Sequence, residues 1–170
     1  MPKLKSVEVS LKFPELFELT GTWEADEAQR LAAWEIYVEL VTRIAVVTLG
    51  PGDGILREAL SSLHALFGIT RDVLRRGGPS LAKPAKKGAL SFGIIAVDVL
   101  NRGVRPFLAR WHPALQGWEA GRAAGKSVAD HEAAWPKNVQ MRAELEAVQR
   151  VLRSYADLLG TVAGVPSLAP

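Results

Sequence analysis

The 170-residue sequence contains no cysteine, and this absence excludes thiolate zinc sites, iron–sulfur clusters, cysteine nucleophiles and disulfide scaffolds. Histidine is scarce as well, with three copies at His64, His112 and His131. His131 and Glu132 begin like a His-Glu-x-x-His metal-binding helix, but Trp135 stands at the position of the second ligand. We therefore expect no metal and no cofactor.

Long hydrophobic runs are also missing. The first five residues lack the apolar segment of a secretion signal, and no stretch of about 18 uncharged apolar residues follows. We expect neither secretion nor a membrane span, and the lack of cysteine suits a reducing cytoplasm. With 48% hydrophobic and 23% charged residues, the composition is typical of a single globular domain over 1–170.

The spacing of apolar residues predicts the fold class. Alternating apolar and polar residues over 6–23, interrupted by Pro14 and Glu15, predict a β-hairpin. Apolar residues at three- and four-residue steps predict helices over 25–49, 54–76, 89–111 and 127–163. A lone hairpin is only marginally stable, so it must lie on the helices. The sequence thus predicts a mainly α fold, a four-helix-bundle-like core with an N-terminal β-hairpin.

Two of these helices carry unusually wide apolar surfaces. In 25–49, a stripe containing Leu31, Trp34 and Val38 is flanked by a second stripe containing Tyr37 and Leu40, which predicts a helix buried on two sides. The last helix has a coiled-coil-like seam made of Met141, Leu145, Val148, Leu152, Tyr155, Leu159 and Val162. Such a seam makes assembly into a homo-oligomer one option for this protein.

Prolines and glycines predict where the helices are interrupted. Pro106 should kink the third helix, and Pro113 should kink or end it. The glycine- and alanine-rich stretch 112–127 is expected to be a connector, after which Ser127 caps the next helix. Residues 77–88 have few apolar side chains and are expected to form a mobile basic loop.

Positive charge is concentrated in one part of the chain. Residues 71–87 carry six basic and one acidic side chain, although the whole chain has a net charge of only +3. Arg71 and Arg75 in this region are candidates for contact with an acidic protein surface or with nucleic-acid phosphate. No aromatic side chain is interleaved with this charge to stack on bases, so nucleic acid is the weaker alternative.

A polar cluster interrupts the apolar third helix. Asp98 and Arg102 are one helical turn apart, as are Asn101 and Arg105, so local pairing is expected. Because their neighbours are apolar, Asp98 is expected to be largely buried and to need a cationic partner. Such a network either fixes packing or lines a functional polar groove.

Arg105 and His112 resemble the arginine–histidine pair of HEPN-superfamily ribonucleases, with six residues between them. The resemblance implies an arginine that stabilises phosphate charge and a histidine that acts as acid or base in attack by the 2′-hydroxyl. Pro106 departs from the family, which usually has a polar residue there. In the alternative interpretation, Arg105 pairs with Asp98 or Asn101, and His112 caps a helix end.

Trp111 and Trp118 lie in a stretch interrupted by proline and glycine. Exposed tryptophans are enriched at protein–protein interfaces, so both are candidate anchors for a protein partner, with core packing beneath a loop as the alternative.

Several segments together resemble small helical proteins of bacteria: Trp34 to Arg43, Ser61 to Arg71, Arg105 to Pro113 and Tyr155 to Leu159. Some of these proteins accompany conflict systems of the CATRA (caspase and TPR-repeat associated) type. The resemblance implies a non-enzymatic adaptor that binds a larger protein, with a role in bacterial antiviral defence. The alternative is a metal-independent ribonuclease that uses Arg105 and His112.

Overall fold

The computed structural model describes residues 6–43, 46, 50 and 52–168. Strands β1 (Val7–Phe13) and β2 (Phe17–Trp23) form the predicted antiparallel hairpin, with Val7 opposite Trp23. Glu15 adopts a left-handed conformation (φ 61°) in the three-residue turn, which is a common way to close such a hairpin. One face of the hairpin is buried through Val9, Leu11, Phe13, Leu19 and Trp23.

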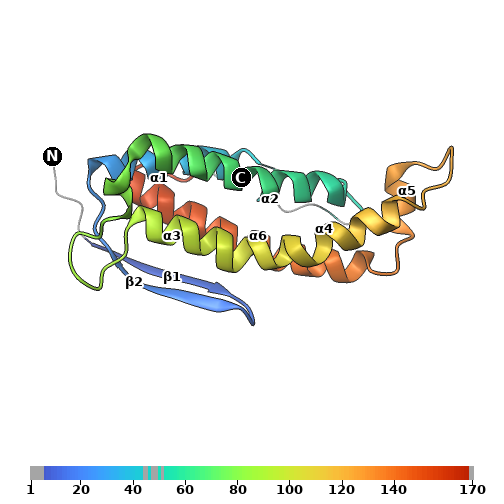
Figure 1. Ribbon diagram of the computed structural model, residues 1–170, viewed down its shortest axis with the longest axis horizontal. Coiled ribbons are helices and arrows are strands. Elements are labelled where there is room, and N and C mark those ends of the chain that lie inside the picture. Colours follow the sequence, from blue (N-terminus) through green and yellow to red (C-terminus); the bar gives the residue numbers. More distant parts are fainter. Residues whose placement is uncertain (1–5, 44–45, 47–49, 51, 169–170) are drawn as a thin grey trace.

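The rest of the chain is helical and completes a mainly α fold (Figure 1). Its elements are α1 (Glu27–Val41), α2 (Leu56–Gly77), the 3₁₀ helix η1 (Pro79–Ala82), α3 (Phe92–Asp98), the π-helix η2 (Val99–Val104), α4 (Arg105–Glu119), α5 (Val128–Ala133) and α6 (Asn138–Ala163). Elements α3, η2 and α4 follow one another as one long rod beside α2, and the hairpin lies along the opposite side (Figure 1).

The first helix is shorter than the predicted 25–49. It begins after Asp26, whose side chain accepts a hydrogen bond from the backbone N–H of Gln29, and it ends at Val41. Thr42 is the C-cap, and both its backbone N–H and its hydroxyl bond to the carbonyl of Val38. Residues 44–45 and 47–49 of the predicted helix lie outside the described residues.

The third helix is longer than predicted, because neither proline ends it. Pro106 lies in the first turn of α4, where a missing N–H costs little, and the wider π turn of η2 precedes it. Pro113 lies inside α4 on its exposed side, where water can reach the carbonyl group that the proline ring leaves unpaired. The predicted connector therefore begins only after Glu119.

The predicted helix 127–163 is two helices, α5 and α6, separated at Pro136. Ser127 caps α5 as predicted, since its hydroxyl accepts a hydrogen bond from the N–H of Asp130 at 3.0 Å. Every residue of the apolar seam on α6 is buried inside the chain, and α6 packs on α1 and β1. A homo-oligomer built on this seam is therefore excluded, because the seam already belongs to the core.

The segment 77–88 is attached to the core. Within it, η1 buries Leu81, and the amide of Gln29 donates to the carbonyl of Lys83 at 3.3 Å. Lys86 forms an ion pair with Glu24 at 3.0 Å. The interpretation of this segment as a mobile loop is wrong for η1, because Leu81 is an apolar anchor within an otherwise basic stretch.

In the part of the chain that the structure describes, no helix has the length and apolar character needed to cross a membrane.

Candidate functional site

Two neighbouring cavities lie between α2 and the rod formed by α3, η2 and α4. Their volumes are about 530 Å³ and 440 Å³, and Phe67, Arg71 and Arg105 line both of them. His64 and His112 complete the polar lining of the first cavity, and Arg75 that of the second. We call these six residues the cationic groove. None of the described residues that line either cavity carries a carboxylate.

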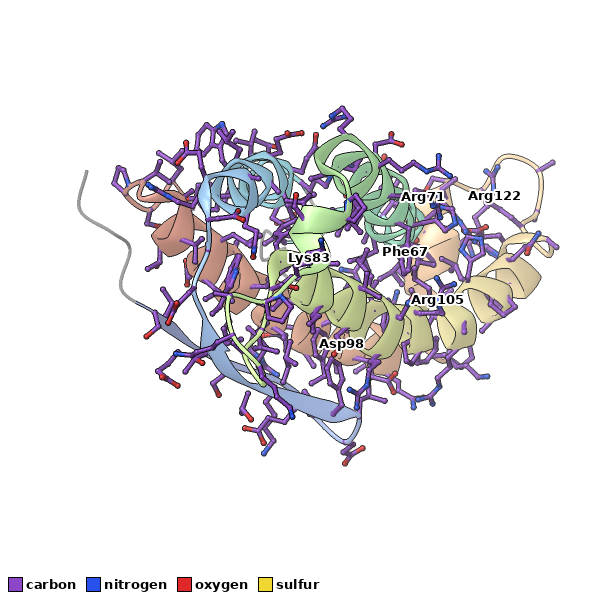
Figure 2. All side chains as sticks on the ribbon, turned by 60° about the vertical axis from the view of Figure 1, so that its left-hand side comes forward. Phe67, Arg71, Lys83, Asp98, Arg105 and Arg122 are labelled. Atoms are coloured by element: carbon purple, nitrogen blue, oxygen red, sulfur yellow. The ribbon has the colours of Figure 1, made fainter. Side chains whose placement is uncertain are left out.

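The spacing of residues on two helices produces the groove. On α2, His64, Phe67, Arg71 and Arg75 follow one another at steps of three or four and so share one face, while the buried face contains Leu60 and Leu63. Arg105 and His112 are two turns apart on α4. Figure 2 shows Phe67, Arg71 and Arg105 together where α2 faces the rod, with Lys83 apart from them beside η1.

The guanidinium of Arg105 is held in place by uncharged groups. Its Nε and Nη2 atoms donate to Oδ1 of Asn101 at 3.2 and 3.0 Å, and its guanidinium lies 4.7 Å from the centre of the Phe67 ring. Both partners are uncharged, so the guanidinium keeps its full charge toward the groove. The predicted local pairing with Asn101 is confirmed, and it is compatible with ligand binding because a guanidinium has further donors.

His112 lies at the surface in the middle of α4, so the interpretation that it caps a helix end is wrong. Its Nδ1 atom is 3.2 Å from Nη1 of Arg57. Arg57 is itself held by Glu119 through two hydrogen bonds of 3.0 and 2.9 Å. Because arginine can only donate, a hydrogen bond between these two side chains requires Nδ1 to accept.

The polar cluster on the third helix divides between two sides of the rod. Asn101 and Arg105 line the groove, whereas Arg102 lies 4.4 Å from the centre of the Phe17 ring of the hairpin. Asp98 is 3.8 Å from Arg102, its predicted cationic partner, and its side chain is 28% exposed, so it is buried only in part.

Trp111 is not an exposed anchor. It is 1% exposed, its Nε1 donates to Glu144 at 2.6 Å, and the Trp135 ring meets it edge-on at 5.9 Å. Trp118 is half-buried, donates to the carbonyl of His131 at 2.8 Å and stacks on the ring of His131. Trp111 packs inward because α4 continues through Pro113, so the prediction that it docks a partner is wrong. Trp118 is only partly buried, and its contact with a partner stays a prediction.

Glu132 is an important residue whose position the sequence does not reveal. It is 4% exposed, and both of its carboxylate oxygens lie 3.0 Å from the backbone N of Leu56, the first residue of α2. Arg142 is 3.4 Å away. Burial raises the pKa of Glu132 above its ordinary value, and the Leu56 hydrogen bond and Arg142 oppose that rise. Glu132 thus caps the helix that carries half of the groove.

Comparison with known proteins gives no match to a family model, to a curated protein or to a solved structure. The resemblances to HEPN ribonucleases and to CATRA-type accessory proteins therefore stay predictions. Among the residues that the structure describes, no three acidic or histidine side chains come together as a metal site would need.

Proposed function

We propose that the protein is a non-enzymatic accessory module whose cationic groove binds the backbone of a single-stranded nucleic acid. The observation that carries this proposal is the composition of the groove: three guanidinium groups and two imidazoles surround Phe67, with no carboxylate among the lining residues described. Arginine forks match the oxygen atoms of phosphate, and charge-assisted hydrogen bonds of this kind are strong.

The dimensions of the groove favour a single strand. Each cavity has a volume typical of a pocket for one small ligand. Because the two cavities are neighbours, each could hold one of two successive nucleotides of a strand. Phe67 lies in both cavities and supplies the aromatic surface for a base that the basic stretch 71–87 lacks. Base–aromatic stacking tolerates any base, so this site would recognise a strand with little sequence preference.

The environment of His112 supports binding without catalysis. A general base needs a free imidazole lone pair, and Nδ1 is engaged by Nη1 of Arg57 at 3.2 Å. This contact leaves Nε2 as the ring nitrogen that can reach a ligand, which suits a hydrogen bond to a phosphate oxygen.

The test is fluorescence anisotropy with labelled oligo(U) and oligo(dT) of about 12 nucleotides at increasing salt. Three phosphate contacts predict a slope of log K against log salt of about −2. Arg71→Ala and Arg105→Ala should each lower the affinity, whereas Arg150→Ala, an exposed arginine on α6 paired with Glu146, should not. Absence of binding at low salt, or equal loss in Arg150→Ala, would contradict the proposal.

The second candidate is RNA cleavage by Arg105 and His112, and their position in the same cavity favours it. Here the 2′-hydroxyl attacks the adjacent phosphorus as it loses its proton, and the 5′-oxygen leaves with a proton, which yields a 2′,3′-cyclic phosphate. Cleavage of oligo(U), but not of oligo(dT), that disappears in folded His112→Ala while binding persists would favour catalysis over simple binding.

The resemblance to CATRA-type accessory proteins further leads us to propose a role in bacterial antiviral defence beside a larger protein partner. Such a partner needs a surface other than Trp111, which is buried within the chain.

A further inference from the structure

One apolar stripe of α1 is uncovered. The stripe containing Leu31, Trp34 and Val38 has the spacing of a core-facing helix surface, yet Leu31 is 57% and Trp34 is 38% exposed. The second stripe of α1 fulfils the prediction, since Tyr37 and Leu40 are each 1% exposed. The prediction that this helix is buried on two sides is therefore wrong within the isolated chain. A core-like stripe without cover indicates a surface that another molecule buries.

The stripe leads into a cleft of about 400 Å³ between α1 and α2, which we call the Trp34 cleft. Trp34 and Val38 from α1 meet Ile69 from α2 at its apolar centre. Tryptophan in a recess is the side chain that most often dominates binding energy at protein interfaces. Two adjacent helices also present ridges and a groove into which a third helix packs well.

The rim of the Trp34 cleft is acidic. Glu35, Glu39 and Asp72 line it, and Arg76 is the cationic side chain among the described lining residues. Glu35 forms an ion pair with Arg76, and Glu39 is 2.7 Å from Arg43, so these two carboxylates are already paired and Asp72 supplies the net negative charge of the rim. The excess of carboxylates attracts a positively charged ligand and repels an acidic one.

We propose that the Trp34 cleft docks a basic amphipathic helix of a protein partner. The apolar face of that helix covers Leu31 and Trp34, and its lysine or arginine side chains face the carboxylates of the rim. This surface is separate from the cationic groove, because the two use opposite flanks of α2. The inference therefore stands independently of nucleic-acid binding.

The test uses the full chain and two synthetic helical peptides of about 18 residues, with leucine at positions i, i+3, i+4 and i+7 and either lysine or glutamate elsewhere. Binding is followed by anisotropy of the labelled peptide. We expect the leucine–lysine peptide to bind and the leucine–glutamate peptide to bind at least about tenfold more weakly. Trp34→Ser and Leu31→Ser should each reduce the affinity for the lysine peptide about tenfold or more.

Val139→Ser is the matched control, because Val139 is an apolar residue of α6 that is 81% exposed and lies outside the cleft. Its affinity for the lysine peptide should equal that of the wild type. Circular dichroism checks that each variant is folded, and Leu31→Ser alone decides the outcome if Trp34→Ser unfolds.

Three results would overturn the proposal. The first is failure of the lysine peptide to bind, and the second is binding that neither Leu31→Ser nor Trp34→Ser weakens. The third is a dimer in sedimentation that dissociates in Leu31→Ser, because the occupant would then be a second copy of this chain. Arg71→Ala should leave the affinity for the lysine peptide unchanged. Peptide binding at the Trp34 cleft can therefore be judged separately from nucleic-acid binding at the cationic groove.

Discussion

The two flanks of α2 border surfaces of different charge. On the flank that faces α4, Arg71 and Arg75 join Arg105 in the cationic groove, whereas on the flank that faces α1, Asp72 joins two glutamates around Trp34. Arg71 and Asp72 are consecutive in the sequence, but about 100° of helical rotation separates them. Within the described part of the chain, the groove flank is lined by arginines without a carboxylate, whereas on the other flank Arg76 is paired with Glu35, so a net charge summed along the chain conceals two surfaces of different character.

The largest expected effect comes from reversing the charge on one flank. Arg71→Glu combined with Arg105→Glu removes two cations and places two anions in the groove, so the affinity for oligo(U) should fall about 100-fold or more. Binding of the leucine–lysine peptide to the Trp34 cleft should not weaken. Titrations of both ligands against the same variant check this, and loss of peptide binding would show that the two flanks are coupled.

The next effect concerns the helix that both flanks share. Glu132→Ala leaves the buried N–H of Leu56 without its acceptor, which should lower the free energy of unfolding by about 1–3 kcal/mol. Urea denaturation measures the change. Glu146→Ala is the control, because Glu146 on α6 is 55% exposed. An equal loss in the control would mean that Glu132 does not hold the start of α2.

A smaller effect should be confined to the groove. Phe67→Leu keeps an apolar side chain but removes the ring beneath Arg105, so the affinity for oligo(U) should fall by about 1 kcal/mol, or roughly fivefold. The peptide affinity of the Trp34 cleft should stay the same. If oligo(U) binds Phe67→Leu as tightly as the wild type, no base stacks on Phe67.

The smallest effect is a pH dependence of stability. Burial raises the pKa of Glu132 above 4.5 in the folded state, so the folded state holds this proton more tightly than the unfolded state does. The associated stability is present below about pH 4.5 and is lost as pH rises through the folded-state pKa. The free energy of unfolding of Glu132→Gln should not show this decline, and urea unfolding of both proteins from pH 4 to 7 measures it. If the free energy of unfolding depends on pH in the same way in the wild type and in Glu132→Gln, this prediction is wrong.

Local patterns in the sequence predicted local structure well. The hairpin over 6–23, the helix over 54–76, the Ser127 cap and the Asn101–Arg105 pair all depend on residues near one another in the chain, and the structure confirms them. The end of α1 and the continuation through Pro113 were missed, because hydroxyl capping and solvent access decide them and apolar spacing does not.

Contacts between residues far apart in the sequence could not be predicted from the sequence. The groove brings His64 and Arg71 to Arg105 and His112, and no periodicity reveals which helix faces α2. Glu132 reaches Leu56 across 76 positions in the chain. Burial of Trp111 likewise depends on Trp135 and Glu144, which belong to later segments.

The π-helix η2 gives the rod a fixed rotational setting. A π turn holds one more residue than an α turn, so the residues of α4 lie about 100° around the axis from where an uninterrupted α-helix through the same sequence would place them. Gly103 lies against the Phe13 ring, which would clash with any Cβ added at this position. Packing of the hairpin against Gly103 therefore fixes the rotation of η2 and α4 about their axis. At this rotation Arg105 and His112 face α2.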